Sequence, residues 1–418
     1  MKKQVYFDRL ETRSSKVRES ALLKALPAHL AHAKRRAPGF ARILAGVEPR
    51  KVTTRKALAA LPVTRKSDLI GLQAQERPLG GLNATPVEKL AKIFMSPGPI
   101  YEPEGKGKNW WRTARALHAG GFRAGDLVLN TFAYHFTPAG SMLESGARAL
   151  GCTVVPAGTG QTEMQVAAIR DLRISAYIGT PSFLKLIVEK ADELKTDISS
   201  LKKAHVGAEY LPPALRQAMA ARGIQVTQSY GSADLGSIAY ETLGPDGAVC
   251  EGMMLDEGLL LEIVRPGTGD PVPVGEVGEV VITTFNRDYP LIRFGTGDLS
   301  AVLPGKSPCG RTNTRIRGWM GRADQSTKVR AMFVTPAQVA AILKRHPEIA
   351  KARLVIEGET GDDRMTLRCE VAAPAAGLGE AVVASIREIT KLRGEVAFVA
   401  PGSLPNDGKV IEDARKYG

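Results

Sequence analysis

The sequence NRDYPLIRFGTGDLS, residues 286–300, carries an apolar run directly into a Gly-Thr-Gly-Asp segment. Residues 289–294 predict a strand that stops at Gly295, where glycine lets the backbone approach a ligand closely. Asp298 would then stand on a turn at the end of a strand. An Asp after Gly is often only a turn residue, but a carboxylate in such a place can also hold the two hydroxyls of a sugar.

A second small-residue turn follows about twenty residues later in GWMGRADQSTKVRAMFVTP, residues 318–336. It offers the guanidinium of Arg322, which can neutralise a phosphate, and the carboxylate of Asp324. A short strand and a Pro-started helix come next. We therefore predict a joint between a large N-terminal domain, residues 1–321, and a C-terminal lid domain, residues 322–418.

Hydrophobic periodicity divides the predicted N-terminal domain into a helical lead-in, residues 1–90, an α/β core, residues 91–254, and a β-rich part, residues 255–321. In the core, apolar runs alternate with helical patterns, which favours a mostly parallel sheet covered on both faces. The predicted fold is α/β, with a small mobile α+β domain at the C-terminus.

The predicted elements of the lead-in are two helices that prolines interrupt, at 15–45 (Pro38) and 54–76 (Pro62). Those of the core are strands at 126–132, 152–157, 176–180, 203–207 and 224–230, with helices near 138–150, 161–171, 181–195 and 212–222. Those of the C-terminal domain are helices at 336–345 and 379–391 and strands at 352–358, 365–372 and 395–400.

The composition, with 44% hydrophobic and 24% charged residues among 418, is that of an ordinary globular protein. No apolar run approaches the ~20 residues that a membrane span needs, and the N-terminus lacks the apolar core of a signal peptide. We therefore expect a cytoplasmic protein. The four cysteines are far apart and form no C-x-x-C pair, which excludes a disulfide framework and a complete zinc site.

The net charge of +14 is concentrated in residues 1–66, where seventeen Lys and Arg residues outnumber four acidic ones. The segment contains three aromatic residues and no recognised nucleic-acid module, so base stacking is poorly served. A solvated helical face is the simplest interpretation. Steering of anionic ligands such as nucleotides is the second, and nucleic-acid binding is the third.

Two strand ends of the core offer further groups to a ligand. The strand 224–230 is predicted to end at Tyr230, whose ring could stack on a planar ligand. Three residues after Gly231, Asp234 could hold a magnesium ion that bridges phosphates. The alternative is a surface turn with a core tyrosine. Residues 207–210 end another strand and could border the same crevice.

The segment FAYHFTPAG, residues 132–140, concentrates aromatic side chains in a chain that has only 6% of them. Strand-like alternation would direct some of them into the core, and the sharper alternative is a flat apolar pocket for an aromatic acid. The residues of this candidate pocket are Phe132, Tyr134, His135 and Phe136.

Two other segments bear on anion binding. IFMSPGPIYEPEG, residues 93–105, combines three prolines with two acids, so its residues alone predict a rigid loop and a poor anion site. LPNDGK, residues 404–409, presents the ammonium of Lys409 on a turn whose Pro and Gly fix its direction. The simpler alternative is a solvated lysine.

Together these motifs resemble those of the adenylate-forming ligases, most closely the phenylacetate-coenzyme A ligase family. The resemblance rests on YGSADLG, YPLIRFGTGD, GRADQSTKVRAMFVTP and LPNDGK in this order, and it extends from about residue 20 to the end. FAYHFTPAG, LGCTVVPAGTGQTE and GTPSFL also resemble that family. It implies that an aromatic acid attacks the α-phosphate of ATP, with Mg²⁺ present, and that coenzyme A then displaces AMP. The sequence leaves open whether the protein forms a homodimer.

The resemblance implies a role for each motif residue. Asp298 would bind the ribose hydroxyls, Arg322 would contact the ribose or a phosphate, and Asp234 would hold the metal ion. Asp324 would be the hinge about which the C-terminal domain rotates, and Lys409 would reach the α-phosphate and the carboxylate. The residues that would surround the nucleotide are Ser96, Gly98, Ala208, Glu209, Tyr210, Ser229, Tyr230 and Gly231.

The chain departs from the family pattern at three places. Where relatives carry a Ser/Thr/Gly-rich loop that ends in Lys, this chain has SPGPIYE, residues 96–102, and only Ser96, Gly98 and the following Pro103 match. Asp234 stands where Glu is usual, which shortens the acid by one carbon. Ala331 replaces a glycine on the loop that borders the pantetheine channel in the family.

Three functions remain. The first is an ATP-dependent aryl-coenzyme A ligase. The second, favoured by the altered phosphate loop, is an ATP-independent acyltransferase or adenylate-binding protein on the same fold. The third is a non-enzymatic anion or nucleic-acid binder that uses the basic N-terminus.

Overall fold

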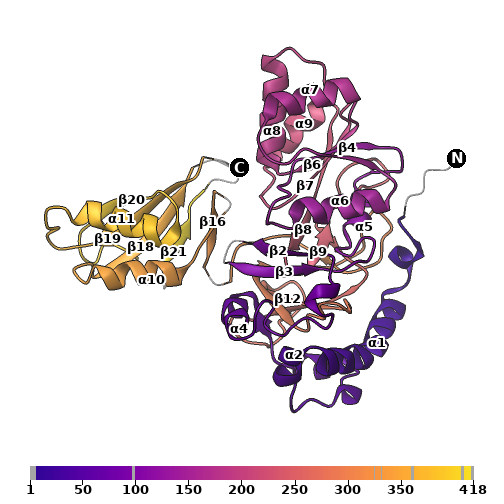
Figure 1. Cartoon of the computed structure of the whole chain (residues 1–418), viewed down its shortest axis with the longest axis horizontal. Coiled ribbons are helices and arrows are strands. Elements are labelled where there is room, and N and C mark those ends of the chain that lie inside the picture. Colours follow the sequence, from indigo (N-terminus) through magenta and orange to yellow (C-terminus); the bar gives the residue numbers. More distant parts are fainter. Residues whose placement is uncertain are drawn as a thin grey trace. The chain divides into compact units, whose positions relative to one another are not determined.

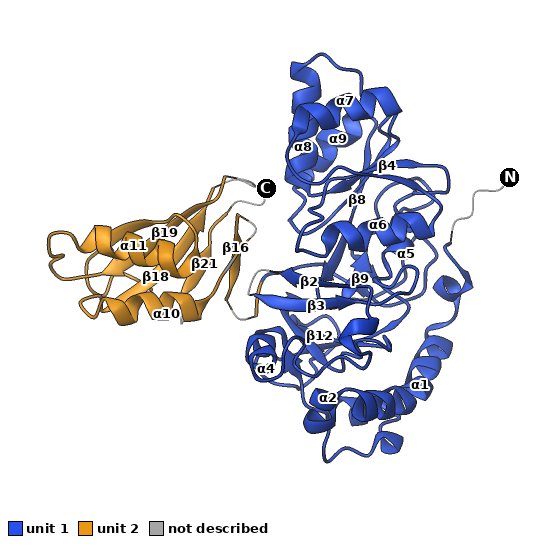
Figure 2. Cartoon of the chain, in the orientation of Figure 1, with its two compact units in different colours: residues 1–321 blue, residues 322–418 orange. Residues whose placement is uncertain are grey.

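The computed structural model describes residues 6–96, 99–323, 325–330, 332–358, 362–405 and 409–415. The chain divides into two compact units, residues 1–321 and 322–418, which Figure 2 shows in different colours. Each unit has its own sheets and its own hydrophobic core. No helix in the described part of the chain combines the length and the apolar character that a membrane span requires.

A sheet of nine strands forms the centre of the first unit. In sheet order, the strands are β14 (Val302–Leu303), β15 (Arg315–Ile316), β10 (Met253–Leu255), β9 (Gly236–Tyr240), β8 (Gln225–Ser232), β7 (Lys203–Val206), β6 (Ala176–Gly179), β4 (Leu127–Asn130) and β5 (Thr153–Pro156). The five strands from β8 to β5 run parallel to one another, which confirms the predicted parallel sheet. The others pair in antiparallel fashion.

Helices cover both faces of the parallel strands, because successive side chains of a strand point to opposite faces. Val128 and Ile178 belong to the core formed with α5 and α6, whereas Leu129 and Tyr177 belong to the core formed with α7, α8 and α9. Figure 1 shows α7, α8 and α9 grouped together and α5 beside α6. The helices are α5 (Thr113–Ala119), α6 (Ala139–Ala149), α7 (Thr162–Leu172), α8 (Pro181–Glu193) and α9 (Pro213–Ala221).

The lead-in helices break at the predicted prolines. Pro38 is the first residue of the second helix, since its fixed φ suits a first turn. Pro62 falls between two short helices, which a strand separates. The helices are α1 (Ser15–Arg36), α2 (Pro38–Ile43), α3 (Arg55–Ala59) and α4 (Leu69–Gln75), with 3₁₀ turns η1 (Arg9–Thr12), η2 (Pro49–Lys51), η3 (Lys66–Asp68) and η4 (Val87–Lys89).

Several basic residues of the N-terminal segment anchor these helices to the first unit. Arg18 donates to Glu257 at 2.8 Å, and Arg13 donates to the same carboxylate at 2.9 Å. Arg55 pairs with Glu19 at 2.6 Å. Part of the local positive charge is therefore structural.

A second sheet of four strands lies in the β-rich part of the first unit. Its order is β1 (Thr64–Arg65), β13 (Phe294–Ser300), β12 (Gly278–Thr284) and β11 (Leu259–Val264). β1 pairs in parallel with β13, so that Thr64 lies opposite Phe294 and Arg65 opposite Gly295. Apolar residues of this sheet share one core with the lead-in helices. The short strand β1 therefore carries the lead-in segment to the strand of Asp298.

The strand of Asp298 lies later in the sequence than predicted. β13 begins at Phe294 instead of ending there, so Asp298 stands inside the strand and not on a terminal turn. Residues 296–298 together oppose Val280 of β12, and the central glycine has a φ of +73°. A bulge of this kind bends a strand and redirects its side chains. The apolar run 289–292 is buried in the core without pairing as a strand.

Most described residues of the segment 93–105 belong to two paired strands rather than to the predicted rigid loop. Its strands β2 (Lys92–Ser96) and β3 (Ile100–Glu104) pair antiparallel, with Ser96 opposite Ile100. Both are edge strands, where a proline needs no ladder hydrogen bond, so Pro103 is tolerated. Glu102 lies in the middle of β3 and is fully buried.

In the part that the structure describes, the second unit contains one main sheet, a short hairpin and two helices. Its main sheet has the order β20 (Glu395–Val399), β19 (Arg364–Glu370), β18 (Lys351–Glu357) and β21 (Ile411–Asp413). Helices α10 (Pro336–Arg345) and α11 (Leu378–Thr390) contribute Val339, Ile342, Val382 and Ile386 to its core. A hairpin of β16 (Thr327–Val329) and β17 (Met332–Val334) precedes α10.

Replacing Thr335 by alanine is expected to lower the free energy of unfolding of this unit by about 1 kcal/mol, as for other lost N-caps. Thr335 Oγ1 accepts from the Gln338 N–H at 3.3 Å, and Gln338 Oε1 accepts from the Thr335 N–H at 3.0 Å. Urea unfolding followed by circular dichroism would measure the loss. Thr335→Ser keeps the hydroxyl and serves as the control, and an equal loss in both variants would contradict the capping role.

Candidate active site

The ammonium of Lys66 lies among three carboxyl groups of the first unit. Its Nζ donates to Asp234 Oδ2 at 2.6 Å, and the Asp234 side chain is fully buried while that of Lys66 is 20% exposed. Burial by itself would lower the pKa of Lys66, but the charges of Asp234, Glu102 and Asp298 outweigh it, so the pKa is raised. Three motifs that are distant in the sequence thus converge on one ammonium ion.

Pairing of β1 with β13 brings Lys66 to this position. Lys66 follows Arg65, the last residue of β1, and begins η3. Asp68 Oδ2 accepts from the Arg65 N–H at 2.8 Å and so fixes the turn that carries the lysine. Sequence patterns assign Lys66 only to the basic N-terminal segment. The one local signal is the acid three residues after Arg65, which is typical of a capped turn.

The hairpin supplies a buried carboxyl group, that of Glu102. The Ser96 N–H donates to Glu102 Oε2 at 3.1 Å, and the Ser96 hydroxyl donates to Oε1. Burial and the nearby charge of Asp234 raise the pKa of Glu102 to about 8, against the opposing effects of Lys66 and Ser96. Glu102 therefore holds its proton far more tightly than an ordinary glutamate. The sequence identifies the position as a departure from the family without revealing these contacts.

Asp298 is held by donors on both of its oxygens. The Tyr230 hydroxyl donates to Oδ2 at 2.8 Å, and Trp319 Nε1 donates to Oδ1 at 3.2 Å. The Asp298 N–H also donates to Thr296 Oγ1 at 3.1 Å, which fixes the bulge. The carboxylate is half-buried. Asp298 is thus oriented by its neighbours and remains accessible, as a group that binds sugar hydroxyls must be.

Tyr230 occupies a different place from the predicted one. β8 continues past it to Ser232, because the strand turns back at once into β9. Its ring is only 8% exposed and belongs to the hydrophobic core. The strand therefore continues to Ser232, past the predicted end, and the Tyr230 hydroxyl gains a role as the donor that positions Asp298.

The two segments predicted to border the base lie side by side. β7 and β8 are parallel neighbours, and a Cβ on Gly207 would lie 3.5 Å from the Ser229 carbonyl oxygen. Ala208 and Gly231 are exposed at the ends of these segments, and Ala208 has a φ of +66°. A Cβ on Gly231 would lie only 2.5 Å from the Gly236 carbonyl oxygen, so the site requires glycine there.

Other polar side chains near the ends of β7 and β8 form hydrogen bonds within the first unit. Glu209 Oε2 accepts from the Ser182 hydroxyl at 2.6 Å, near the start of α8. Ser229 Oγ lies 3.0 Å from Nε2 of His205, whose burial lowers its pKa to about 4 and keeps it neutral. Tyr210 is half-buried. These contacts give the edge a fixed shape.

The four aromatic residues of the predicted acid pocket differ in burial. Phe132 is buried in the core, whereas His135 and Phe136 are exposed, Phe136 by 70%. The Tyr134 hydroxyl accepts from Asn130 Nδ2 at 2.7 Å. Strand-like alternation does not apply, because the segment is a loop between β4 and α6. A common acid pocket for all four residues stays a prediction.

Asp234 offers an oxygen suited to magnesium. Its Oδ2 accepts from Lys66, whereas Oδ1 is buried and has no hydrogen-bond partner among the described residues. Mg²⁺ is usually held by one or two carboxylates, with phosphates and waters as its other ligands, so Oδ1 fits this role. Within the described ranges, no group of three His, Cys, Asp or Glu side chains is arranged to hold a metal ion. All four cysteines are free and buried.

Arg322 and Lys409 of the predicted site belong to the second unit. Arg322 Nε donates to Ser326 Oγ at 3.0 Å. The N–H of Val410, the neighbour of the exposed Lys409, donates to Gln325 Oε1 at 2.8 Å, so this unit joins the predicted hinge segment to the lysine segment. Three predicted residues lie outside the described ranges, namely Gly98, Asp324 and Ala331.

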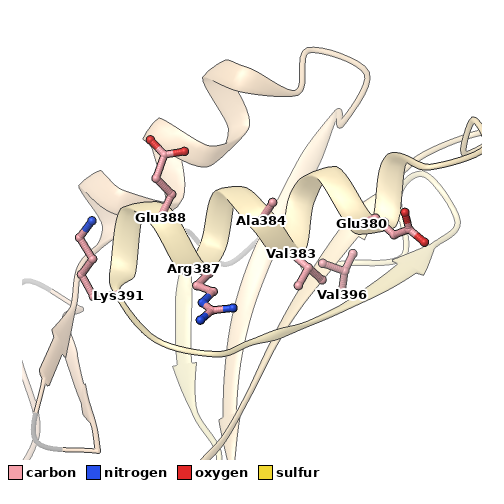
Figure 3. A pocket seen from close by; sticks show the side chains of 8 residues that line it. Glu380, Val383, Ala384, Arg387, Glu388, Lys391 and Val396 are labelled. Carbon is pink, nitrogen blue, oxygen red and sulfur yellow. The ribbon is translucent and has the colours of Figure 1, made fainter.

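A surface groove of about 980 Å³ follows α11 of the second unit (Figure 3). Its lining includes the apolar Val383 and Val396 and the charged Glu380, Arg387 and Lys391. None of the predicted site residues lines it. We therefore place the candidate active site at Lys66 and not in this groove.

Comparisons with known proteins identify the family of the chain. Residues 107–286 match the family described as AMP-binding enzyme. A phenylacetate-coenzyme A ligase of Thermus thermophilus is 33% identical over 82% of this chain and 79% of its own length. The ligase of the same name from Escherichia coli is 32% identical, over 79% of this chain and 77% of its own.

A similar fold is also known from a solved structure. The 2-hydroxyisobutyryl-CoA ligase in complex with its acyl-adenylate and CoA has a TM-score of 0.82 and 26% identity, over 98% of this chain and 92% of its own. The chain thus belongs to the phenylacetate-coenzyme A ligase family, whose members are adenylate-forming, acid-thiol ligases.

Proposed function

We propose that the chain activates an aromatic carboxylic acid of the phenylacetate type with ATP and transfers the acyl group to coenzyme A. The observation that carries the proposal is the convergence of Asp298 and Asp234 on Lys66. A nucleotide needs an acceptor for its ribose hydroxyls at one end and cationic or metal-binding groups for its phosphates at the other. Asp298 and the pair of Lys66 with Asp234 supply both within one unit.

The proposed reaction has two steps. The substrate carboxylate attacks the α-phosphorus of ATP, a phosphorus–oxygen bond forms, and pyrophosphate leaves as the α–β anhydride bond breaks. The sulfur of coenzyme A then attacks the acyl carbon, AMP leaves, and the thiol proton is released. Lys409 would neutralise charge that develops at the α-phosphate, and Mg²⁺ bound at Asp234 would neutralise charge on the phosphates.

The remaining residues keep the roles expected for the family. Residues 208–210 and 229–231 would border the adenine, Arg322 would contact the ribose or a phosphate, and Asp324 would serve as the hinge. Ser96 would lie beside the phosphates, since it holds the Glu102 carboxyl group next to Asp234. Ala331 would border the thiol channel.

The aromatic acid is supported by the loop beside the hairpin. The Met95 N–H of β2 donates to the Phe136 carbonyl oxygen at 2.8 Å, so the aromatic loop adjoins the hairpin that carries Glu102. Phe94, from the same hairpin, and Phe132, from the same loop, belong with Trp111 to one hydrophobic cluster. The relatives named phenylacetate-coenzyme A ligase favour the same substrate class.

Pyrophosphate release with a panel of acids would test the substrate class. We expect release to need ATP and Mg²⁺, and kcat/KM to be at least about tenfold higher for phenylacetate than for 2-hydroxyisobutyrate, the discrimination that an apolar pocket gives. Benzoate and 4-hydroxyphenylacetate would define the length and polarity of the pocket. A preference for 2-hydroxyisobutyrate would reject the aromatic acid and keep the ligase reaction.

An ATP-independent acyltransferase is the second candidate, and the Glu102 carboxyl group favours it. A carboxyl group beside the predicted phosphate site opposes a triphosphate more than it opposes an adenylate. Acyl exchange between a preformed thioester and free acid without ATP would support this candidate. Turnover that depends strictly on ATP would exclude it.

A further inference from the structure

Trp319 lies beside the carboxylate that is proposed to accept the ribose hydroxyls. Its Nε1 donates to Asp298 Oδ1 at 3.2 Å. Tryptophan is highly buried on average in folded proteins, whereas 42% of Trp319 and 42% of its neighbour Met320 are exposed. Adjacent exposed apolar side chains of this size are typical of a surface that a ligand covers.

The backbone at Trp319 is fixed to the strand of Asp298. The Met320 N–H donates to the Leu299 carbonyl oxygen at 2.9 Å, and the Leu299 N–H donates to the Gly321 carbonyl oxygen at 2.9 Å. The end of the first unit therefore runs beside β13. Because the backbone is held on that strand, the indole stands at a defined place next to the carboxylate.

A ribose held by Asp298 shares the space next to this indole. A hydroxyl that donates to Oδ1 lies about 2.7 Å from it, and Trp319 Nε1 lies 3.2 Å from the same atom. The hydroxyl oxygen is then at most about 6 Å from Nε1. Both the sugar and the indole extend beyond these two atoms, which brings them into contact.

We propose that Trp319 is a nucleotide-binding residue: its Nε1 orients the Asp298 carboxylate, and its exposed ring packs on the ribose of the nucleotide. The inference rests on the proposed function, because it requires the ribose to bind at Asp298. The ring offers the sugar an apolar surface, and the N–H restrains rotation of the carboxylate. Since the contact is with the ribose, it is the same for ATP, AMP and the acyl-adenylate.

Quenching of tryptophan fluorescence by acrylamide in the full chain would test the contact. Acrylamide quenches exposed indoles by collision, and Trp319 is 42% exposed whereas Trp111 is 1% exposed. AMP should reduce the quenching of the wild type, because the sugar covers the ring. Pyrophosphate, which has no ribose, should not reduce it. In Trp319→Phe, AMP should give no protection from quenching.

Trp110→Phe is the matched control. The chain has three tryptophans, and the other two donate to different acids, Trp110 to Asp288 Oδ2 at 2.8 Å and Trp111 to Glu104 Oε2 at 2.9 Å. Trp110 is half-buried. Its replacement should lower the total fluorescence and retain the protection that AMP gives.

Calorimetric titration with AMP and with ATP would measure how much Trp319 contributes to binding. Trp319→Phe keeps an aromatic ring but loses the N–H donor, so its affinity should be about fivefold weaker. Trp319→Ala also loses the apolar surface, and its affinity should be at least about 20-fold weaker. The ratio of the two nucleotide affinities should stay as in the wild type.

The outcomes separate this inference from the proposed function. Protection by AMP that persists in Trp319→Phe, protection by pyrophosphate, or wild-type AMP affinity in Trp319→Ala would overturn the role of Trp319. AMP binding that is weakened in Asp298→Ala but does not protect the wild type from quenching would also overturn it, and would leave the proposed function standing. Failure of AMP and ATP to bind the wild type would overturn the proposed function itself.

Discussion

Replacing Lys409 by alanine is expected to slow adenylation about 100- to 1,000-fold, the loss that follows removal of one preorganised donor from a developing charge. Lys409 is exposed and lies two residues before β21. The neighbouring Val410 is fixed on both sides, since its N–H donates to Gln325 Oε1 at 2.8 Å and its carbonyl accepts from the Leu354 N–H at 2.9 Å. The backbone is therefore anchored while the side chain is exposed. Pyrophosphate release at saturating acid and ATP measures the effect.

Two comparisons separate this role from a general loss of structure. Lys344→Ala removes another exposed lysine of the same unit, in the last turn of α10, and should leave the rate unchanged. Thioester formation from a preformed acyl-adenylate should be close to wild type in Lys409→Ala, because the role proposed for Lys409 is confined to the adenylation step. Equal losses in both half-reactions would show that the assigned role is wrong.

The regular part of the fold could be predicted because its signals are local. Each parallel strand of the first unit is a short apolar run between helical patterns, and the observed strands agree with the predicted ones to within about two residues. Pro38 marked a break in the lead-in helices, and a new helix begins there. Thr335 and Pro336 marked a helix start, and Thr335 caps that helix.

The errors lie where pairing partners decide the structure. β13 begins at Phe294 and pairs with β12, with a bulge at residues 296–298. Nothing in the apolar run before Phe294 reveals which residues of β12 it will pair with. The segment of the hairpin was predicted as a loop because prolines are disfavoured in a central strand. They are tolerated in the two edge strands that it forms. Phe136 is exposed because its segment forms no strand at all.

The same distinction applies to the candidate site. Asp298 and Asp234 could be proposed because each lies in a glycine-containing motif that is recognisable from the local sequence alone. Lys66 could not, because its position depends on a two-residue strand that pairs with a strand more than two hundred residues away. The sequence showed that Glu102 departs from the family but not that Ser96 and Asp234 surround it. Residues placed by long-range pairing need the structure.

Replacing Asp298 by alanine is expected to weaken ATP and AMP binding alike, by about 10- to 100-fold, the range for lost hydrogen bonds to a charged group. The ribose is common to both nucleotides, so the ratio of the two affinities should not change. Tyr230→Phe removes the donor at 2.8 Å from Oδ2 and leaves Trp319 Nε1 on Oδ1, so a smaller loss of about fivefold is expected. Asp246→Ala alters an exposed turn of the same unit and should bind both nucleotides like the wild type. If Asp298→Ala weakened ATP binding but not AMP binding, the carboxylate would act on phosphates rather than on the ribose. The orientation of the nucleotide at Lys66 would then have to be reversed.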